Sequence, residues 1–130
     1  MRVFVVNTLF TLHFLIVVVW IGLFFVPLNW WPDKILFHFY LTIIIIGHQI
    51  IWGLLIYPLT KELRMVCILT TFMQLLRGER IASRSNYQHA FIAEALQRAG
   101  IRDANRPATI FNVVLSIVVI LQYFLYYIYR

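Results

Sequence analysis

The sequence predicts an all-α integral membrane protein with three transmembrane helices and two surface helices. The 130 residues are 62% hydrophobic and 12% charged, whereas soluble domains are about 45–50% apolar and about 25% charged. Three uncharged apolar runs are each long enough to cross a bilayer, and a strongly basic segment separates the second run from the third. The whole chain therefore forms one membrane domain.

The first predicted span covers residues 3–26. It contains no charged residue, and its length matches the ~20 residues that cross about 30 Å of hydrocarbon. A signal peptide has a shorter apolar core of about 7–15 residues followed by a small-residue cleavage site. We therefore expect this segment to be retained as an anchor.

A short turn leads into the second predicted span, residues 35–59. The connection, residues 27–34, contains two prolines, which end helices, and the adjacent Trp30 and Trp31, whose rings suit the headgroup layer. Tyr57 and Pro58 indicate the second interface. Because the connection is short, the two spans are expected to form an antiparallel hairpin.

The basic segment, residues 60–106, carries eight of the eleven Lys and Arg residues. The positive-inside rule places such a segment in the cytoplasm, together with the amino terminus, and favours a bacterial inner membrane. Its charges lie beside membrane spans, so anionic lipid headgroups are the expected partner and nucleic acid is not. The residues predicted to contact the membrane surface are Lys61, Arg64, Arg77, Arg80 and Arg84.

Two helices are predicted within this basic segment. Residues 65–76 are apolar but too few to span a bilayer, which favours an interfacial or re-entrant helix. Residues 86–99 follow the capping-box pattern of Ser85 and Gln88 and precede Gly100, a typical helix stop. This second helix is predicted to be amphipathic and to lie at the membrane surface.

The third predicted span covers residues 107–129. Pro107 is well tolerated in a first helical turn. Tyrosines at the far end form an aromatic belt of the kind found at membrane interfaces; they are Tyr123, Tyr126, Tyr127 and Tyr129.

His13 and His48 lie near the middles of the first and second spans, so an antiparallel hairpin places them at matching depth. Two facing imidazoles can ligate the iron of a b-type haem, and polar groups at this depth are often functional. Alternatively, they hydrogen-bond between helices, which contributes about 0.6 kcal/mol on average. A substrate or proton path is the third reading, and all three stay open at this point.

A second polar stripe lies on the second span. At about 100° per residue His38 shares a helical face with Gln49, and with Trp52 these residues could line a groove for a lipid or quinone. The simpler reading is that His38 reaches the headgroups. On the third span, Asn112 and Ser116 are four residues apart and present a polar stripe to a neighbouring helix.

No pattern in the sequence indicates an enzyme or a metal site. There is no nucleophile with an adjacent base, no paired carboxylates and no glycine-rich phosphate loop. The spans contain no Asp, Glu, Lys or Arg, which argues against an ion-driven transporter. The single cysteine, Cys67, excludes an internal disulfide.

The order of several short motifs resembles a family of small bacterial membrane proteins classed only as a domain of unknown function. The shared features are Leu12-His13, Gly22-Leu23, Trp31-Pro32, His38, Gly47, Pro58-Leu59-Thr60 with Glu62, Phe91-Ile92, and Ala99-Gly100-Ile101 before an aromatic final span. The chain departs from the family pattern at Tyr57, where a cysteine is expected, and at Ile51, where an acidic residue is expected. The resemblance implies architecture and no activity.

These observations favour a small structural or accessory subunit of a larger membrane assembly, or a self-associating protein, because three spans bury little of their own surface. The alternatives are a b-type haem or other tetrapyrrole protein that uses His13 and His48, and a small lipid- or quinone-binding protein with a groove near His38 and Gln49.

The charge bias predicts that residues 60–106 are cytoplasmic and that the turn at Trp30 and Trp31 faces the opposite side. A cysteine introduced near Asp33 should react with an impermeant thiol reagent added to intact cells, and a cysteine near Arg84 should not. Reaction only at the position near Arg84 would reverse the assigned topology.

Overall fold

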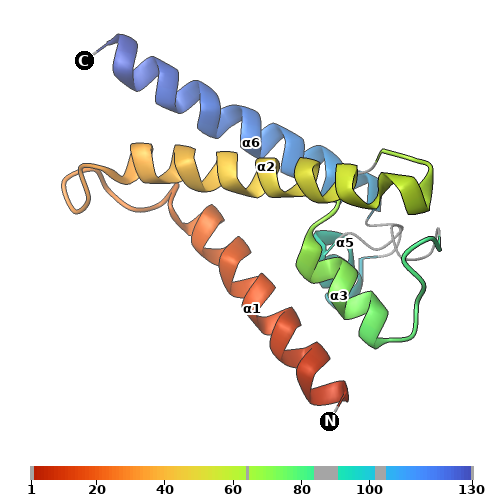
Figure 1. Cartoon of the computed structure of the whole chain (residues 1–130). Coiled ribbons are helices and arrows are strands. Elements are labelled where there is room, and N and C mark those ends of the chain that lie inside the picture. Colours follow the sequence, from red (N-terminus) through yellow and green to blue (C-terminus); the bar gives the residue numbers. More distant parts are fainter. Residues whose placement is uncertain (1, 64, 84–90, 102–104, 130) are drawn as a thin grey trace.

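The computed structural model describes residues 2–63, 65–83, 91–101 and 105–129, and in this part of the chain it contains helices joined by turns and loops, with no strand. Its helices are α1 (Arg2–Gly22), α2 (Lys34–Thr60), α3 (Ile68–Leu76), α5 (Phe91–Arg98) and α6 (Asn105–Ile128). Figure 1 shows α1 and α2 diverging from the turn that joins them, with α3 and α5 near the open end of this V.

The turn between α1 and α2 is closed by a buried lysine. Helix α1 ends at Gly22, earlier than the predicted 26, because tight turns begin at Leu23 and Pro27 has no N–H with which to continue a helix. Lys34 opens α2, is only 7% exposed, and donates through Nζ to the carbonyl oxygens of Leu23 and Val26. The ammonium group thereby bonds two carbonyls of the turn that follows α1.

One buried hydrogen bond joins α1 to α2 a short distance from the turn. The Trp20 indole Nε1 donates to Thr42 Oγ1 at 2.8 Å, and the Thr42 hydroxyl donates to the carbonyl oxygen of His38, also at 2.8 Å. Trp20 is 2% exposed and Thr42 is fully buried. Since no water competes for these groups inside a bilayer, the indole N–H depends on this protein partner.

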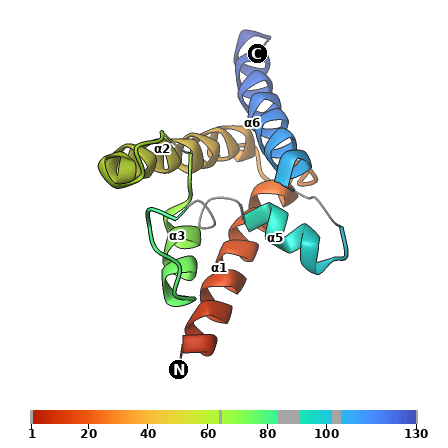
Figure 2. The ribbon, with the colours of Figure 1, turned by 90° about the vertical axis from the view of Figure 1, so that its right-hand side faces the viewer.

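Helix α6 packs along α2 and runs back toward the turn end of the molecule, as Figure 1 shows. Near that end Phe39 of α2 stacks on Tyr123 of α6, with ring centroids 3.9 Å apart and planes 15° from parallel. Val119 and Ser116 of α6 are buried. The view in Figure 2 shows α6 on a different side of α2 from α1, so α2 is the shared member of both pairs.

The two short helices pack between the long ones. Helix α3 contacts α1 and α2, and Trp52 of α2 donates through Nε1 to Thr71 Oγ1 of α3 at 3.0 Å; α5 packs against α6. Each short helix ends at a glycine with positive φ, Gly78 at 96° and Gly100 at 91°. The paired backbone bonds that follow are those of the Schellman motif, so the predicted stop at Gly100 is confirmed.

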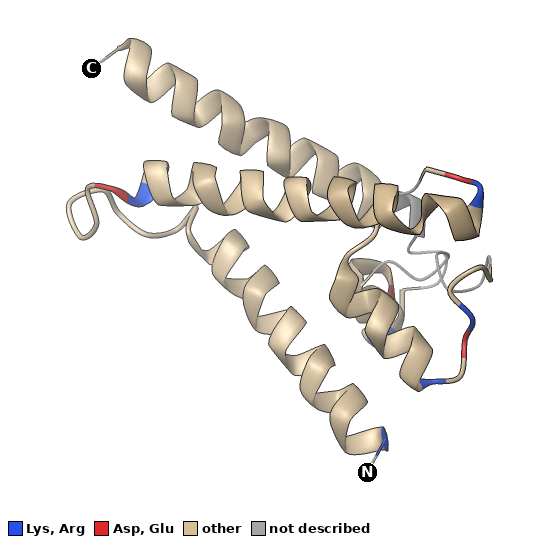
Figure 3. Cartoon of the chain, viewed as in Figure 1, with Lys and Arg blue, Asp and Glu red and all other residues tan. Residues whose placement is uncertain are grey.

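The charged residues lie near the ends of the long helices and in the loops, so an apolar band crosses the middle of the molecule. Figure 3 shows no Lys, Arg, Asp or Glu along the middle of the three long helices. Three helical stretches are long and apolar enough to cross a membrane, namely Arg2–Gly22, Lys34–Thr60 and Ala108–Ile128. The predicted all-α membrane protein with three spans is therefore confirmed.

Residues 84–90 lie outside the described residues, so the predicted capping box and the start of the predicted 86–99 helix lie outside them too.

Replacing Trp20 by Phe or Thr42 by Val should each destabilise the α1–α2 pair by about 0.6–2 kcal/mol, because either change removes the hydrogen bond between the two helices. The double variant should lose less than the sum of the two single losses, since both changes remove the same bond. Thermal unfolding in detergent measures each loss. Strictly additive losses would show that the bond does not couple the helices.

Candidate functional site

A cavity of about 700 Å³ lies among the long helices and the two short ones. Its walls are mostly apolar and include Ile16, Ile45, Ile117 and Ile120. We call it the interhelical cavity. Its polar lining residues come from α1, α2, the segment before α3, α3 itself and α6: His13, His48, Gln49, Cys67, Thr70, Thr109, Asn112 and Ser116.

The two mid-span histidines both line this cavity. His13 of α1 is 9% exposed, and its ring stacks on Phe91 at the start of α5, with centroids 4.0 Å apart and planes 13° from parallel. Its Nδ1 atom is buried and has no hydrogen-bond partner among the described residues. A buried ring nitrogen without a partner is costly, so it marks a place where a ligand group could bond.

His48 is held by two neighbours. Its Nδ1 lies 3.2 Å from the carbonyl oxygen of Ile44, and its Nε2 lies 3.4 Å from Cys67 Sγ. A carbonyl oxygen can only accept, so Nδ1 carries the proton and Nε2 presents its lone pair. The Cys67 thiol therefore donates to Nε2, and the imidazole is oriented as a base toward the sulfur.

Cys67 lies at the amino-terminal end of α3, where it is the N-cap residue. Burial raises the pKa of its thiol, so the thiol is neutral at rest. Its side chain makes no capping hydrogen bond to the first turn of α3. The free N–H groups of a first helical turn nevertheless favour negative charge close to them.

The residues of the predicted groove do not share one cavity. Gln49 lines the interhelical cavity. His38 lies outside that lining and contacts Phe24 edge-on at a centroid distance of 4.7 Å. It is 2% exposed, and its Nε2 is buried without a hydrogen-bond partner among the described residues. Trp52 bonds to Thr71 of α3.

The predicted surface arginines and lysine occupy different settings. Lys61 ends α2 with a left-handed φ of 58° and is exposed. Arg80 follows α3 and takes part in an interaction within the chain. Arg64 and Arg84 lie outside the described residues.

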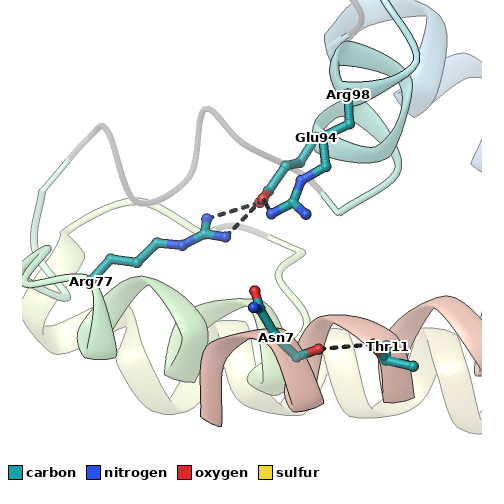
Figure 4. Close-up of polar contacts among 5 residues, drawn as sticks. All are labelled: Asn7, Thr11, Arg77, Glu94 and Arg98. Carbon is teal, nitrogen blue, oxygen red and sulfur yellow. Dashed lines mark hydrogen bonds and ion pairs between the residues drawn. The ribbon is translucent and has the colours of Figure 1, made fainter. Parts of the chain in front are cut away.

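Arg77 belongs to an ionic cluster with Glu94 and Arg98, which Figure 4 shows beside α1 with the Asn7 side chain pointing toward it. Arg77 bonds both oxygens of the Glu94 carboxylate at 2.8 and 2.9 Å, and Arg98 bonds one of them at 2.9 Å. The Arg98 guanidinium also lies 4.0 Å from the centroid of Phe10, whose ring is 4.9 Å from that of Phe91. The cluster thus ties α3 to α5 next to the cavity wall.

The cavity contains two histidines, but it does not present a free ring nitrogen from each of them, as haem binding requires. Axial ligation needs one free ring nitrogen from each histidine, directed at a common iron. His48 Nε2 has a lone pair, but it is directed at Cys67. The observed contacts fit a thiol–imidazole pair more closely than an axial ligand.

The sequence carries no signal that Cys67 and Phe91 belong to this site. Nineteen residues separate Cys67 from His48, and this separation matches no helical spacing. Phe91 reaches the cavity only because α5 packs between the spans. The polar stripe of Asn112 and Ser116 was visible in the sequence, and both residues line the cavity.

Comparison with protein-family models, with curated proteins and with solved structures finds no match for this chain. The resemblance described above therefore stays an interpretation of short motifs.

Replacing Glu94 by Gln should lower the stability by about 1 kcal/mol or less near neutral pH, because the pairs are partly exposed. Hydrogen bonds from Arg77, then from Arg98, hold the Glu94 pKa below its ordinary value of 4.5 against the opposing effect of burial. The carboxylate thus stabilises the fold fully above pH 4.5, and this contribution is lost as the pH falls through the lowered pKa.

Thermal unfolding in detergent, compared between wild type and Glu94→Gln across this pH range, measures the effect. The difference should shrink in acid, and Arg77→Lys, which keeps the charge but loses the two-pronged contact, should fall between them. A difference that grows in acid would contradict the assigned role.

Proposed function

We propose that this protein binds a single lipid-like amphiphile, with a long apolar tail and an uncharged head group, in the interhelical cavity. The observation that carries this proposal is the cavity itself, which joins apolar walls to a small set of polar side chains inside three membrane-spanning helices. Ligand sites typically measure about 300–1,000 Å³ and show this combination.

The lining residues favour an uncharged head group. The described lining includes no Lys, Arg, Asp or Glu, so a charged group would enter without a counter-ion. Gln49 and Asn112 can each donate and accept, and His13 Nδ1 is buried without a protein partner. Carbonyl groups such as those of a quinone or a fatty ester match these donors.

The orientation in the membrane is part of the proposal. Figure 3 shows Lys and Arg residues at the start of α1, at the end of α2 and after α3, all away from the α1–α2 turn. The positive-inside rule supports placing these residues on the cytoplasmic side of a bacterial inner membrane, with the turn outside.

Haem binding is a second candidate, favoured by the presence of His13 and His48 in one cavity. Bound haem would supply electron transfer, and His13 and His48 would be the residues that hold it. The absorption spectrum of the purified protein separates the candidates, since a Soret band lost in His13→Ala or His48→Ala would replace the lipid proposal. The accessory-subunit hypothesis stays a prediction from the sequence.

A photoactivatable fatty-acid methyl ester, whose head group is uncharged, should label purified wild-type protein on peptides that line the cavity. Val17→Phe, which adds volume at a lining position, should reduce the labelling several-fold. Val18→Phe adds the same ring at an exposed position outside the lining and should leave labelling unchanged. Digestion and mass spectrometry locate the label. Equal labelling of both variants, or labelling confined to outward-facing positions, would contradict the proposal.

A further inference from the structure

The contact between Cys67 and His48 has the arrangement of an activated nucleophile. Covalent catalysis by a thiol needs a base within hydrogen-bond reach and a third group that orients the base. Here Nε2 of His48 lies 3.4 Å from the sulfur, and the Ile44 carbonyl fixes Nδ1. All the parts of a nucleophile–base pair are therefore present.

The surroundings of the sulfur suit an acyl-transfer step. Cys67 is the N-cap residue of α3, so the free N–H groups of the first helical turn lie next to it. Attack on a carbonyl places negative charge on its oxygen, and preorganised N–H donors at a helix start stabilise such a charge. A helix start by itself would show little, but His13, 9% exposed and with an unpartnered Nδ1, lines the same cavity.

The shape of the cavity indicates which acyl group fits. Cys67 lies in its lining together with apolar side chains from every long helix, among them Val17, Ile45 and Ile117. A hydrocarbon chain attached at the sulfur would extend along these walls and make van der Waals contacts with them. A short acyl group would leave most of the cavity unfilled.

We propose that Cys67 accepts a long-chain acyl group from an acyl thioester and carries it as a thioester whose chain occupies the interhelical cavity. This inference rests on the proposed lipid-binding function and names the chemical class of the ligand.

The reaction balances without an oxidant or reductant. The Cys67 sulfur attacks the acyl carbonyl carbon while His48 Nε2 takes the thiol proton. The bond between the acyl carbon and the donor sulfur breaks, and His48 returns the proton to that departing sulfur. The products are acylated Cys67 and a free donor thiol. Because burial keeps the Cys67 thiol neutral, the reaction depends on the imidazole as a base.

The test uses the full-length protein in detergent micelles with palmitoyl coenzyme A. Intact-mass measurement should show the addition of one palmitoyl group, located at Cys67 by peptide mapping and removed by hydroxylamine. Cys67→Ser should acquire no hydroxylamine-sensitive group. His48→Gln should react about 100-fold more slowly, because it keeps a polar side chain but has no base. His38→Gln, on the same helix but outside the cavity, should react like wild type.

Selectivity for the chain supplies a second, independent readout. Palmitoyl coenzyme A should react much faster than acetyl coenzyme A, and Val17→Phe should remove this preference while Val18→Phe retains it. Equal rates for both donors in wild type, or equal palmitoylation of wild type and His48→Gln, would show ordinary chemical acylation and overturn the proposal. So would acylation at any other residue, or none in wild type that retains its native size-exclusion profile.

Failure here is distinguishable from failure of the lipid-binding proposal. Cys67→Ser retains the cavity, so it should still be labelled by the photoactivatable fatty-acid methyl ester. If that variant is labelled but wild type is not acylated, lipid binding stands and the covalent step is wrong. If neither reaction occurs, both proposals are wrong.

Discussion

The hydrogen bond between Trp20 and Thr42 is the contact on which the arrangement of the long helices depends. Helices within a bilayer gain no hydrophobic driving force from each other, because lipid covers apolar side chains equally well. A buried polar bond has no such substitute. Together with Lys34, which bonds two carbonyls of the turn after α1, this bond joins α1 and α2 near that turn. It leaves their other ends free to diverge.

The divergence explains why an apolar protein of this size contains a cavity. Two helices in contact along their whole length would leave no room between them. In this fold α3 and α5 enter the open end and are held there by the Trp52–Thr71 bond and by the ionic cluster around Glu94. Short helices fill the space only partly, and the volume that stays between them and α6 is lined by polar groups from five segments.

The sequence was sufficient to predict the three spans, because hydrocarbon thickness sets their length and charges are excluded from them. It also predicted that His13 and His48 lie at matching depth, which stays a prediction; the structure places both in the lining of the interhelical cavity. The sequence did not predict that α1 would end at Gly22, since the tight turns after it depend on Lys34 reaching back. The contact between Cys67 and His48 could not be predicted from the sequence either. It joins α2 to the extended residues before α3, so it follows no helical spacing. His38 and Gln49 share a helical face by counting, but only Gln49 reaches the cavity.

Helix α2 contacts each of its neighbours through a different residue. Phe39 stacks on α6, Thr42 bonds to α1, His48 meets Cys67, and Trp52 bonds to α3. Each added residue turns a helix by about 100°. One insertion between Phe39 and Trp52 would therefore rotate some of these contacts away from their partners while leaving the others in place. An insertion in the loop after α3 would not rotate these contacts, because the loop is not part of α2. Natural variation in length should accordingly collect in the loops of this fold and avoid the central stretch of α2.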